Sequence, residues 1–123
     1  SPTDRAEHLR RVAHIAKILN DQGIIAICSF ISPGENIRNQ CAQIIGENRF
    51  HLVHMDASLE YCKNNKPKLY QLAEEGKLRH MPGVDEKFET PENAVLTLNP
   101  EPDGENTERI IEYLAGEKVF PLQ

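Results

Sequence analysis

The sequence predicts an α/β fold with a mainly parallel sheet. Short apolar runs at residues 24–30, 51–55 and 94–98 have the length and composition of buried strands. Segments with helical spacing separate these runs, and strands that alternate with helices are typical of a parallel sheet covered by helices. The chain of 123 residues has the length of one domain, so we expect residues 1–123 to form a single unit.

The first helix is predicted from the N-terminal residues to a turn at Gly23. Ser1 can cap this helix, Pro2 suits its first position, and apolar residues recur after them at helical spacing. Gly23 is the residue type that most often follows the end of a helix. The next run, IIAICSF at residues 24–30, is apolar throughout, so we expect a strand that is buried on both faces.

The remaining elements follow in alternation. Ser58 is a predicted helix cap, and the prolines and glycines between residues 76 and 93 indicate a loop-rich stretch. We expect helices over residues 35–45, 58–62, 67–75 and 106–114, strands over residues 51–55 and 94–98, and a turn over residues 100–104.

The formal net charge is −5, from 14 Lys and Arg against 19 Asp and Glu. This mildly acidic balance argues against bulk binding to duplex nucleic acid, because such binding relies on cations that neutralise phosphates. No apolar run approaches the roughly 20 residues that span a bilayer, and no signal peptide is visible. We therefore expect neither a nucleic-acid partner nor a membrane partner.

Cysteine usage indicates a reducing compartment. Cys28, Cys41 and Cys62 form no C-x-x-C pair, and an odd number of cysteines is a poor basis for a disulfide framework or a zinc site. We expect three structural thiols and a cytoplasmic protein. His51 and His54 are separated by an odd offset on a predicted strand, which places them on opposite faces, so no metal site is expected there.

Two groups of residues are candidates for ligand binding. In open parallel α/β sheets, ligands bind beyond the carboxyl ends of the strands, and Ser32 lies at such an end. Arg5 and His8 are three residues apart and share a helical face, and a guanidinium suits phosphate or sulfate oxygens. The alternative interpretations are a turn-forming Ser32 before Pro33 and a solvated charged face on the helix.

A phosphate cradle is not encoded in the chain. The pattern G-x-x-x-x-G-K-[ST] is absent. The one Gly-Lys pair is Gly76-Lys77, and the carboxylates of Glu74 and Glu75 precede it and would repel phosphate. Analysis of the residues alone therefore predicts an α/β domain with a ligand site at a strand end and a capacity to bind anions.

Six short stretches carry a resemblance to a known family. They are DRAEHLRR (4–11), FISP (30–33), MDASLEYC (55–62), LY (69–70), GVD (83–85) and FETP (88–91). In this order the chain resembles the adenylylsulfate kinase family, of which it matches the C-terminal two-thirds. The resemblance implies a P-loop-kinase-like three-layer sandwich. It also implies ATP-dependent phosphorylation of the 3′-hydroxyl of adenylyl sulfate to 3′-phosphoadenylyl sulfate, in sulfate activation, with ATP and Mg²⁺.

The resemblance leaves part of the family's domain outside this sequence. The family's P-loop and first strand would lie before Ser1, and that strand lies between those matching residues 24–30 and 51–55. We therefore expect a partial domain that is inactive in isolation, because positioned phosphates and Mg²⁺ provide most of the catalysis in phosphoryl transfer. We expect it to rearrange, to form a homo-oligomer, or to associate with a missing N-terminal segment or a sulfurylase domain.

The resemblance also implies a substrate-binding set. Arg5 matches a family arginine that contacts adenylyl sulfate, whereas His8 replaces a substrate-contacting asparagine. Met81 replaces a phenylalanine that stacks on the substrate adenine. The implied substrate-binding residues are Arg5, His8, Ile31, Ser32, Arg38 and Met81. No catalytic residue is assigned, since the P-loop is missing.

Departures from the family leave alternatives open. Gly34 to Ile37 replace most of an Arg-rich lid helix, of which Arg38 is the one retained match, and Gln71 to Glu74 replace a basic segment. A divergent adenylylsulfate kinase is the main interpretation. The alternatives are a non-catalytic nucleotide-binding regulatory domain, fused to or associated with a sulfurylase, and a kinase for another nucleotide or sugar acceptor.

Overall fold

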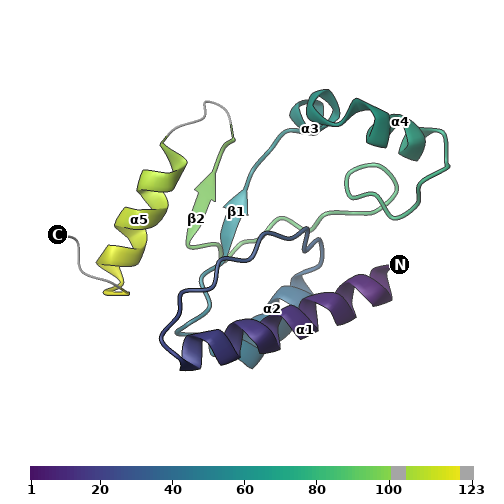
Figure 1. The fold of residues 1–123 in the computed structure, drawn as a ribbon. Coiled ribbons are helices and arrows are strands. Elements are labelled where there is room, and N and C mark those ends of the chain that lie inside the picture. Colours follow the sequence, from purple (N-terminus) through teal and green to yellow (C-terminus); the bar gives the residue numbers. More distant parts are fainter. Residues whose placement is uncertain (101–104, 120–123) are drawn as a thin grey trace.

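The structure is a computed structural model that describes residues 1–100 and 105–119, and it confirms the α/β class. Figure 1 shows the arrangement of the elements. The helices are α1 (Pro2–Asp21), α2 (Glu35–Ile45), α3 (Leu59–Asn65), α4 (Pro67–Glu74) and α5 (Asn106–Gly116), and the strands are β1 (Val53–Met55) and β2 (Leu96–Leu98). Among the described residues, no helix is long and apolar enough to cross a membrane.

The sheet of the described residues consists of β1 and β2, which run parallel. Val53 faces Leu96 and Met55 faces Leu98 across the pair. The Asp56 amide donates to the Leu98 carbonyl at 2.7 Å and so continues the ladder past the end of β1. The parallel pairing is as predicted, although each strand is two residues shorter at its start than expected. Leu98 is fully buried, so this pair forms a core of the fold.

A second core lies where α1 packs against α2. Leu9, Ala13 and Ala16 are the buried residues of α1, and the two alanines allow the helices to approach closely. The Cys41 thiol of α2 lies 3.7 Å from the Leu9 carbonyl. Burial raises the pKa of the Cys41 thiol, as expected for an inert structural thiol. All three cysteines are free.

The ends of α1 confirm the signals in the sequence. The Asp4 amide donates to the Ser1 hydroxyl at 3.2 Å, and the Ser1 hydroxyl donates to the Asp4 carboxylate at 2.7 Å, so a capping box closes the N-terminus. Gly23 has a φ of 79°, a conformation that side chains rarely adopt, and so it ends the helix as expected. Ser58 likewise caps α3 by accepting from the Tyr61 amide.

The strand predicted over residues 24–30 is wrong. The segment is extended, but residues 25–31 make no hydrogen bond in the described part of the chain. Nor is the segment buried on both faces, since Ile27 is 86% exposed and Ile25 is 46% exposed. The reason is that a strand needs a hydrogen-bonding neighbour, and β1 pairs only with β2 among the described residues.

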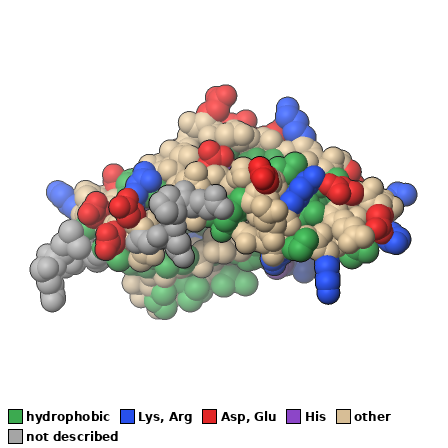
Figure 2. Space-filling view, turned by 90° about the horizontal axis from the view of Figure 1, so that it is seen from above, with side chains coloured by type: hydrophobic (Ala, Val, Ile, Leu, Met, Phe, Trp, Pro, Cys, Tyr) green, Lys and Arg blue, Asp and Glu red, His purple; other side chains and the backbone are tan. Residues whose placement is uncertain are grey.

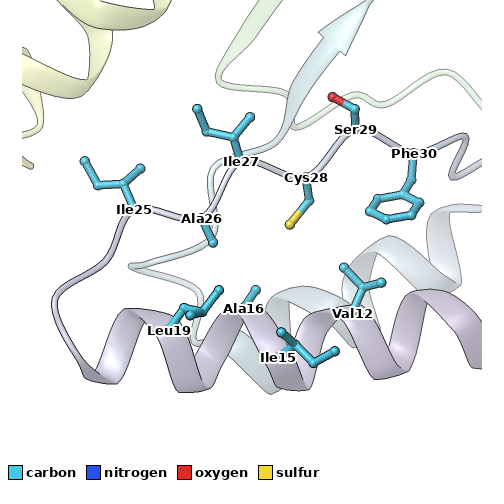
Figure 3. A pocket seen from close by; sticks show the side chains of 10 residues that line it. All are labelled: Val12, Ile15, Ala16, Leu19, Ile25, Ala26, Ile27, Cys28, Ser29 and Phe30. Carbon is cyan, nitrogen blue, oxygen red and sulfur yellow. The ribbon is translucent and has the colours of Figure 1, made fainter.

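The side chains of this segment nevertheless alternate as in a strand. In Figure 3, Ala26, Cys28 and Phe30 point toward α1, whereas Ile25 and Ile27 point away from it. A hollow of about 500 Å³ remains between the segment and the apolar face of α1. Its lining is apolar except for Ser29 and Cys28, so it is a region of incomplete packing rather than a polar ligand site.

Two further predictions concern the C-terminal part. The helix expected over residues 106–114 is confirmed as α5, whose Tyr113 hydroxyl lies 2.9 Å from the His51 Nδ1. In Figure 1 this helix lies beside β2, away from α1 and α2. The turn expected over residues 100–104 falls mostly on residues 101–104, which lie outside the described residues.

Candidate functional site

Arg5 is positioned on the first turns of α1, where it faces the loop between α4 and β2. Its Nη1 lies 2.5 Å from the Glu86 Oε2, and its Nη2 donates to the His80 carbonyl at 2.9 Å. The side chains of Arg5 and Glu86 are 26% and 19% exposed, so the pair is only partly shielded from water. The guanidinium therefore lies at a place that solvent and ligands can reach.

The loop that faces Arg5 is held in shape by one carboxylate. Asp85 accepts hydrogen bonds from the His80 amide at 2.8 Å and from the Met81 amide at 2.6 Å. These backbone donors hold the pKa of the Asp85 carboxyl below its ordinary range. His80 has a φ of 60°, so the carboxylate supports a strained turn. The result is a fixed position for Met81, next to the carbonyl that Arg5 contacts.

His8 lies one turn after Arg5 and contacts the segment that ends the apolar run. The His8 and Phe30 rings meet edge to face with centroids 5.4 Å apart and planes inclined by 66°. Ile31 follows this contact and is 55% exposed, and Ser32 is half-buried. The contact between α1 and Phe30 thus places Ile31 and Ser32 near the N-terminal turns of α1.

Arg38 of α2 is buried, with 4% of its surface exposed. Its Nη1 donates to the Ser32 carbonyl at 2.6 Å and its Nη2 donates to the Glu89 carbonyl at 2.7 Å. The guanidinium carbon lies 5.9 Å from the centre of the Phe88 ring. The Nε is buried and has no partner. Arg38 therefore joins two segments of backbone from the inside.

These contacts link members of the implied substrate-binding set, or the residues next to them in sequence, to α1 and α2. Arg5 and His8 come from α1, Ile31 and Ser32 follow the extended segment, and Met81 belongs to the loop that Arg5 holds. Arg38 of α2 donates to the Ser32 carbonyl. We call this set, made of Arg5, His8, Ile31, Ser32, Arg38 and Met81, the Arg5 cluster.

Arg5 and Arg38 bring two guanidinium groups to the Arg5 cluster. A guanidinium offers a planar fork of donors that fits phosphate and sulfate oxygens. Elsewhere on the surface the charges are mixed, and Figure 2 shows acidic and basic side chains interspersed over the face in view. In this structure the Arg5 guanidinium is paired with Glu86 and the Arg38 guanidinium is buried, so Arg5 is the more accessible of the two.

The single Gly-Lys pair of the described residues forms no phosphate-binding loop. Lys77, the lysine of the single Gly-Lys pair, donates to the Glu75 carboxylate at 2.6 Å, and Gly76 before it sits in a helix-ending turn. The described part of the chain contains no group of three or more His, Cys, Asp or Glu side chains that could hold a metal ion. His51 and His54 have separate partners, Tyr113 and Phe88.

Three functional neighbours were missed in the sequence. Glu86, Glu89 and Asp85 hold the site together, yet sequence reasoning assigned them no role. Glu86 is 81 residues from Arg5, and the Glu89 carbonyl is 51 residues from Arg38, so no local spacing connects them. The one available signal was that Asp85 and Glu89 belong to the GVD and FETP stretches that carry the family resemblance.

Comparison with known proteins identifies relatives of the whole described fold. The family model "Adenylylsulphate kinase" matches residues 1–99. An adenylyl-sulfate kinase of Staphylococcus haemolyticus is 35% identical over 98% of this chain, and the chain covers 62% of that protein. The "Bifunctional enzyme CysN/CysC" of Rhodopirellula baltica is 37% identical over 80% of this chain, which covers 16% of that protein.

A solved structure agrees with these matches. An APS kinase from Mycobacterium tuberculosis, in complex with AMPPNP and APS, superposes with a TM-score of 0.86 at 33% identity, over 93% of this chain and 68% of that one. The chain spans 62% of the Staphylococcus protein and 42% of an adenylyl-sulfate kinase of Arabidopsis thaliana, so it covers only part of the length of these relatives. With a family match over most of its length and a shared P-loop kinase fold, the chain belongs to the adenylylsulfate kinase family.

Proposed function

We propose that this chain is the acceptor-binding part of an adenylylsulfate kinase, an enzyme that phosphorylates the 3′-hydroxyl of adenylyl sulfate to 3′-phosphoadenylyl sulfate. The observation that supports this most directly is the Arg5 cluster. The partly exposed guanidinium of Arg5 lies one helical turn before His8, and the His8 ring contacts Phe30, the residue before Ile31 and Ser32. Family membership makes adenylyl sulfate the expected anion.

In this proposal Arg5 binds the anionic group of the substrate. Its current partner, Glu86, would be replaced in that step, and the exchange is feasible because a partly exposed ion pair contributes only about 1 kcal/mol. His8 and Met81 would lie against the rest of the nucleotide, where Met81 can cover a ring face. Ile31 and Ser32 would line the opposite wall.

ATP supplies the phosphoryl group of this reaction in the family, and we propose that its phosphates are held by polypeptide outside these 123 residues. The chain encodes no phosphate-binding loop, and its Gly-Lys pair is tied to Glu75. We therefore expect little or no phosphoryl transfer from this chain alone.

The partners of the complete enzyme are part of the same proposal. The extended segment 25–31 supports association with further polypeptide, either a missing N-terminal segment or a second copy, because its backbone groups make no hydrogen bond within the described residues. The bifunctional relative supports a fused or associated second enzyme, for which a sulfurylase is the candidate. The substrate is a soluble nucleotide, and we place the enzyme in the cytoplasm.

The test is a calorimetric titration of the chain with adenylyl sulfate, with Arg5→Ala and Arg11→Ala compared in parallel. Arg11 is the matched control, because it lies on the same helix, is 70% exposed and pairs only with Glu7. We expect saturable binding that Arg5→Ala weakens by about 10-fold to 100-fold, as for the loss of a charged hydrogen bond, and that Arg11→Ala leaves unchanged. Equal affinity for all three proteins would remove Arg5 from the site.

A second function is favoured by one observation on α4. In this chain Gln71 donates to Glu75 and Glu74 pairs with Lys63, so the region where the family has a basic segment is internally neutralised. A domain that binds the nucleotide without turning it over is consistent with this change. An ATP-dependent assay on a polypeptide extended to the length of the relatives decides between the two, with other nucleotide and sugar acceptors as further substrates.

A further inference from the structure

Four hydrogen bonds hold the turn before α2, and three of them join this region to Glu89. Two come from the Arg38 guanidinium to the carbonyls of Ser32 and Glu89. The third runs from the Glu89 amide to the Pro33 carbonyl at 2.7 Å. The fourth runs from the Glu35 amide to the Glu89 Oε2 at 2.6 Å. We call these contacts the Arg38–Glu89 clamp.

The burial of Arg38 indicates how it acts. A charge removed from water is retained only where hydrogen bonds replace its hydration, and here the replacements are backbone carbonyls from two different segments. With 4% of its surface exposed, the guanidinium leaves no room for a ligand to approach it. Its effect on a ligand must therefore pass through the segments that it holds.

Glu89 has a complementary role at the start of α2. The helix begins after Gly34, which has no side chain to cap it. The Glu89 carboxylate takes this role from a distant part of the sequence, since it accepts from the first free amide of the helix. The start of α2, and with it the Ser32–Pro33 turn, is thus defined by a residue 54 positions later.

The clamp is also connected to the sheet and to Arg5. Phe88 lies under the Arg38 guanidinium and stacks on the ring of His54 in β1, with centroids 5.9 Å apart and planes inclined by 17°. Two residues before Phe88, Glu86 pairs with Arg5. The segment 86–89 therefore contacts α1, α2 and β1, and it fixes the two sides of the Arg5 cluster relative to each other.

We propose that Arg38 and Glu89 are positioning residues, which set the distance and orientation of Ile31 and Ser32 relative to Arg5 without contacting the substrate. This inference rests on the proposed function and changes the role of Arg38 within it. The clamp predicts that substitutions in Glu89, which lies outside the implied substrate-binding set, weaken ligand binding. It also predicts that Arg38 and Glu89 act as one unit, so their effects are not additive.

The test uses Glu89→Gln, Arg38→Lys and their combination, with Glu92→Gln as the matched control. Glu92 is an exposed carboxylate three residues away that makes no hydrogen bond in the described structure. Glu89→Gln keeps the backbone hydrogen bonds and removes only the charge at the start of α2, so we expect this variant to fold. It therefore keeps the test decisive if Arg38→Lys does not fold. Two readouts are compared: the amide NMR signals of residues 31–36, and the affinity for adenylyl sulfate.

We expect Glu89→Gln and Arg38→Lys each to shift the amide signals of Ile31, Ser32 and Glu35 and to reduce affinity at least threefold, with the double variant little worse than Arg38→Lys alone. Glu92→Gln should change neither readout. Unmoved signals at Ile31 and Ser32 in both variants would overturn the clamp, whether or not the ligand binds. Shifted signals with unchanged affinity would also overturn it, as the clamp would then be merely structural.

The two hypotheses fail in distinguishable ways. If the unmodified chain does not bind adenylyl sulfate while the amide signals still move as expected, the proposed function fails and the coupling of residues 31–36 to Glu89 stands. If the unmodified chain binds and Arg38→Lys abolishes binding while Glu89→Gln has no effect, Arg38 contacts the ligand itself and the positioning role is wrong.

Discussion

Two neighbouring stretches of the chain, residues 24–31 and residues 32–38, differ sharply in how they are held. The first is apolar and extended, and residues 25–31 make no hydrogen bond among the described residues. The second contains a buried arginine and polar groups, and three hydrogen bonds join it to Glu89, while a fourth joins Arg38 to Ser32 within the stretch. The more hydrophobic stretch is thus the one held by fewer hydrogen bonds.

The difference shows that a strand depends on its neighbours more than a turn does. The turn at residues 32–38 finds its partners within the chain, from Glu89 and its own Arg38. The apolar segment needs another strand along its edge, and the described residues do not offer one. Composition therefore indicates what a segment can become, whereas the presence of a partner decides whether it does.

The largest expected effect is in hydrogen exchange. Amides of residues 25–31 have no acceptor, so they should exchange at nearly the rate of an unfolded chain. Amides in the middle of α2 should be protected by at least about a thousand-fold, since core elements open only with a sizeable part of the global free energy. The measurement is exchange followed by NMR. Protection of residues 25–31 at high protein concentration alone would indicate that a second copy pairs with them.

Two single substitutions test the same contrast through the free energy of unfolding. Leu98→Ala empties a fully buried position in β2 and should lower the free energy of unfolding by about 3 kcal/mol. Ile27→Ala removes a side chain that is 86% exposed and should change it by less than about 0.5 kcal/mol. Urea unfolding measures both values. A comparable loss for both would show that Ile27 is buried in solution, by self-association or by rearrangement.

The same contrast explains how much of the fold could be predicted. Helix starts followed from local signals, such as the caps at Ser1 and Ser58, because these contacts span three residues. The end of α3 did not, since the helix continues to Asn65, three residues beyond the expected end. The parallel order of β1 and β2 followed from alternation along the chain. The segment 24–30 was misassigned because its pattern encodes a buried strand, while pairing is a property of the whole sheet.

The candidate site was predictable to a similar extent. Helical spacing predicted that Arg5 and His8 lie one turn apart on a helix, and α1 confirms that helix. The strand end expected at Ser32 is absent, because residues 24–30 form no strand, and the binding role of Ser32 stays a prediction. The partners of Arg5 and Arg38 were not predictable, because Glu86 and Glu89 are far away in the sequence and lie in a loop without a periodic pattern. Long-range pairing of this kind is visible only after folding.

A smaller effect is expected from the helix start that Glu89 caps. Glu89→Gln should lower the free energy of unfolding by about 1 kcal/mol, within the range of helix-capping contributions, because a charged acceptor of the Glu35 amide becomes neutral. Glu92→Gln should have no measurable effect. Thermal unfolding measures this difference. The same midpoint for both variants and the parent chain would mean that water caps α2 as well as Glu89 does. Residues 32–38 would then depend less on the Arg38–Glu89 clamp than its geometry indicates.

The smallest effect concerns the loop that continues from the clamp to Arg5. The His80 and Met81 amides hold the pKa of the Asp85 carboxyl below its ordinary value of 3.8. A carboxyl with a lowered folded-state pKa stabilises the fold above its unfolded-state pKa, and this contribution is lost as the pH falls through the folded-state pKa. The loop should therefore be intact at pH 5 and should loosen progressively below pH 3.8, as carboxyl protonation weakens both hydrogen bonds.

The amide NMR signals of His80 and Met81, followed from pH 5 downward, report this change. In Asp85→Asn they should be shifted at pH 5 and nearly independent of pH. Because the carboxylate is exposed, the change should stay confined to residues near the loop, and simultaneous loss of the α2 signals would mean that acid unfolds the clamp and the loop as one unit.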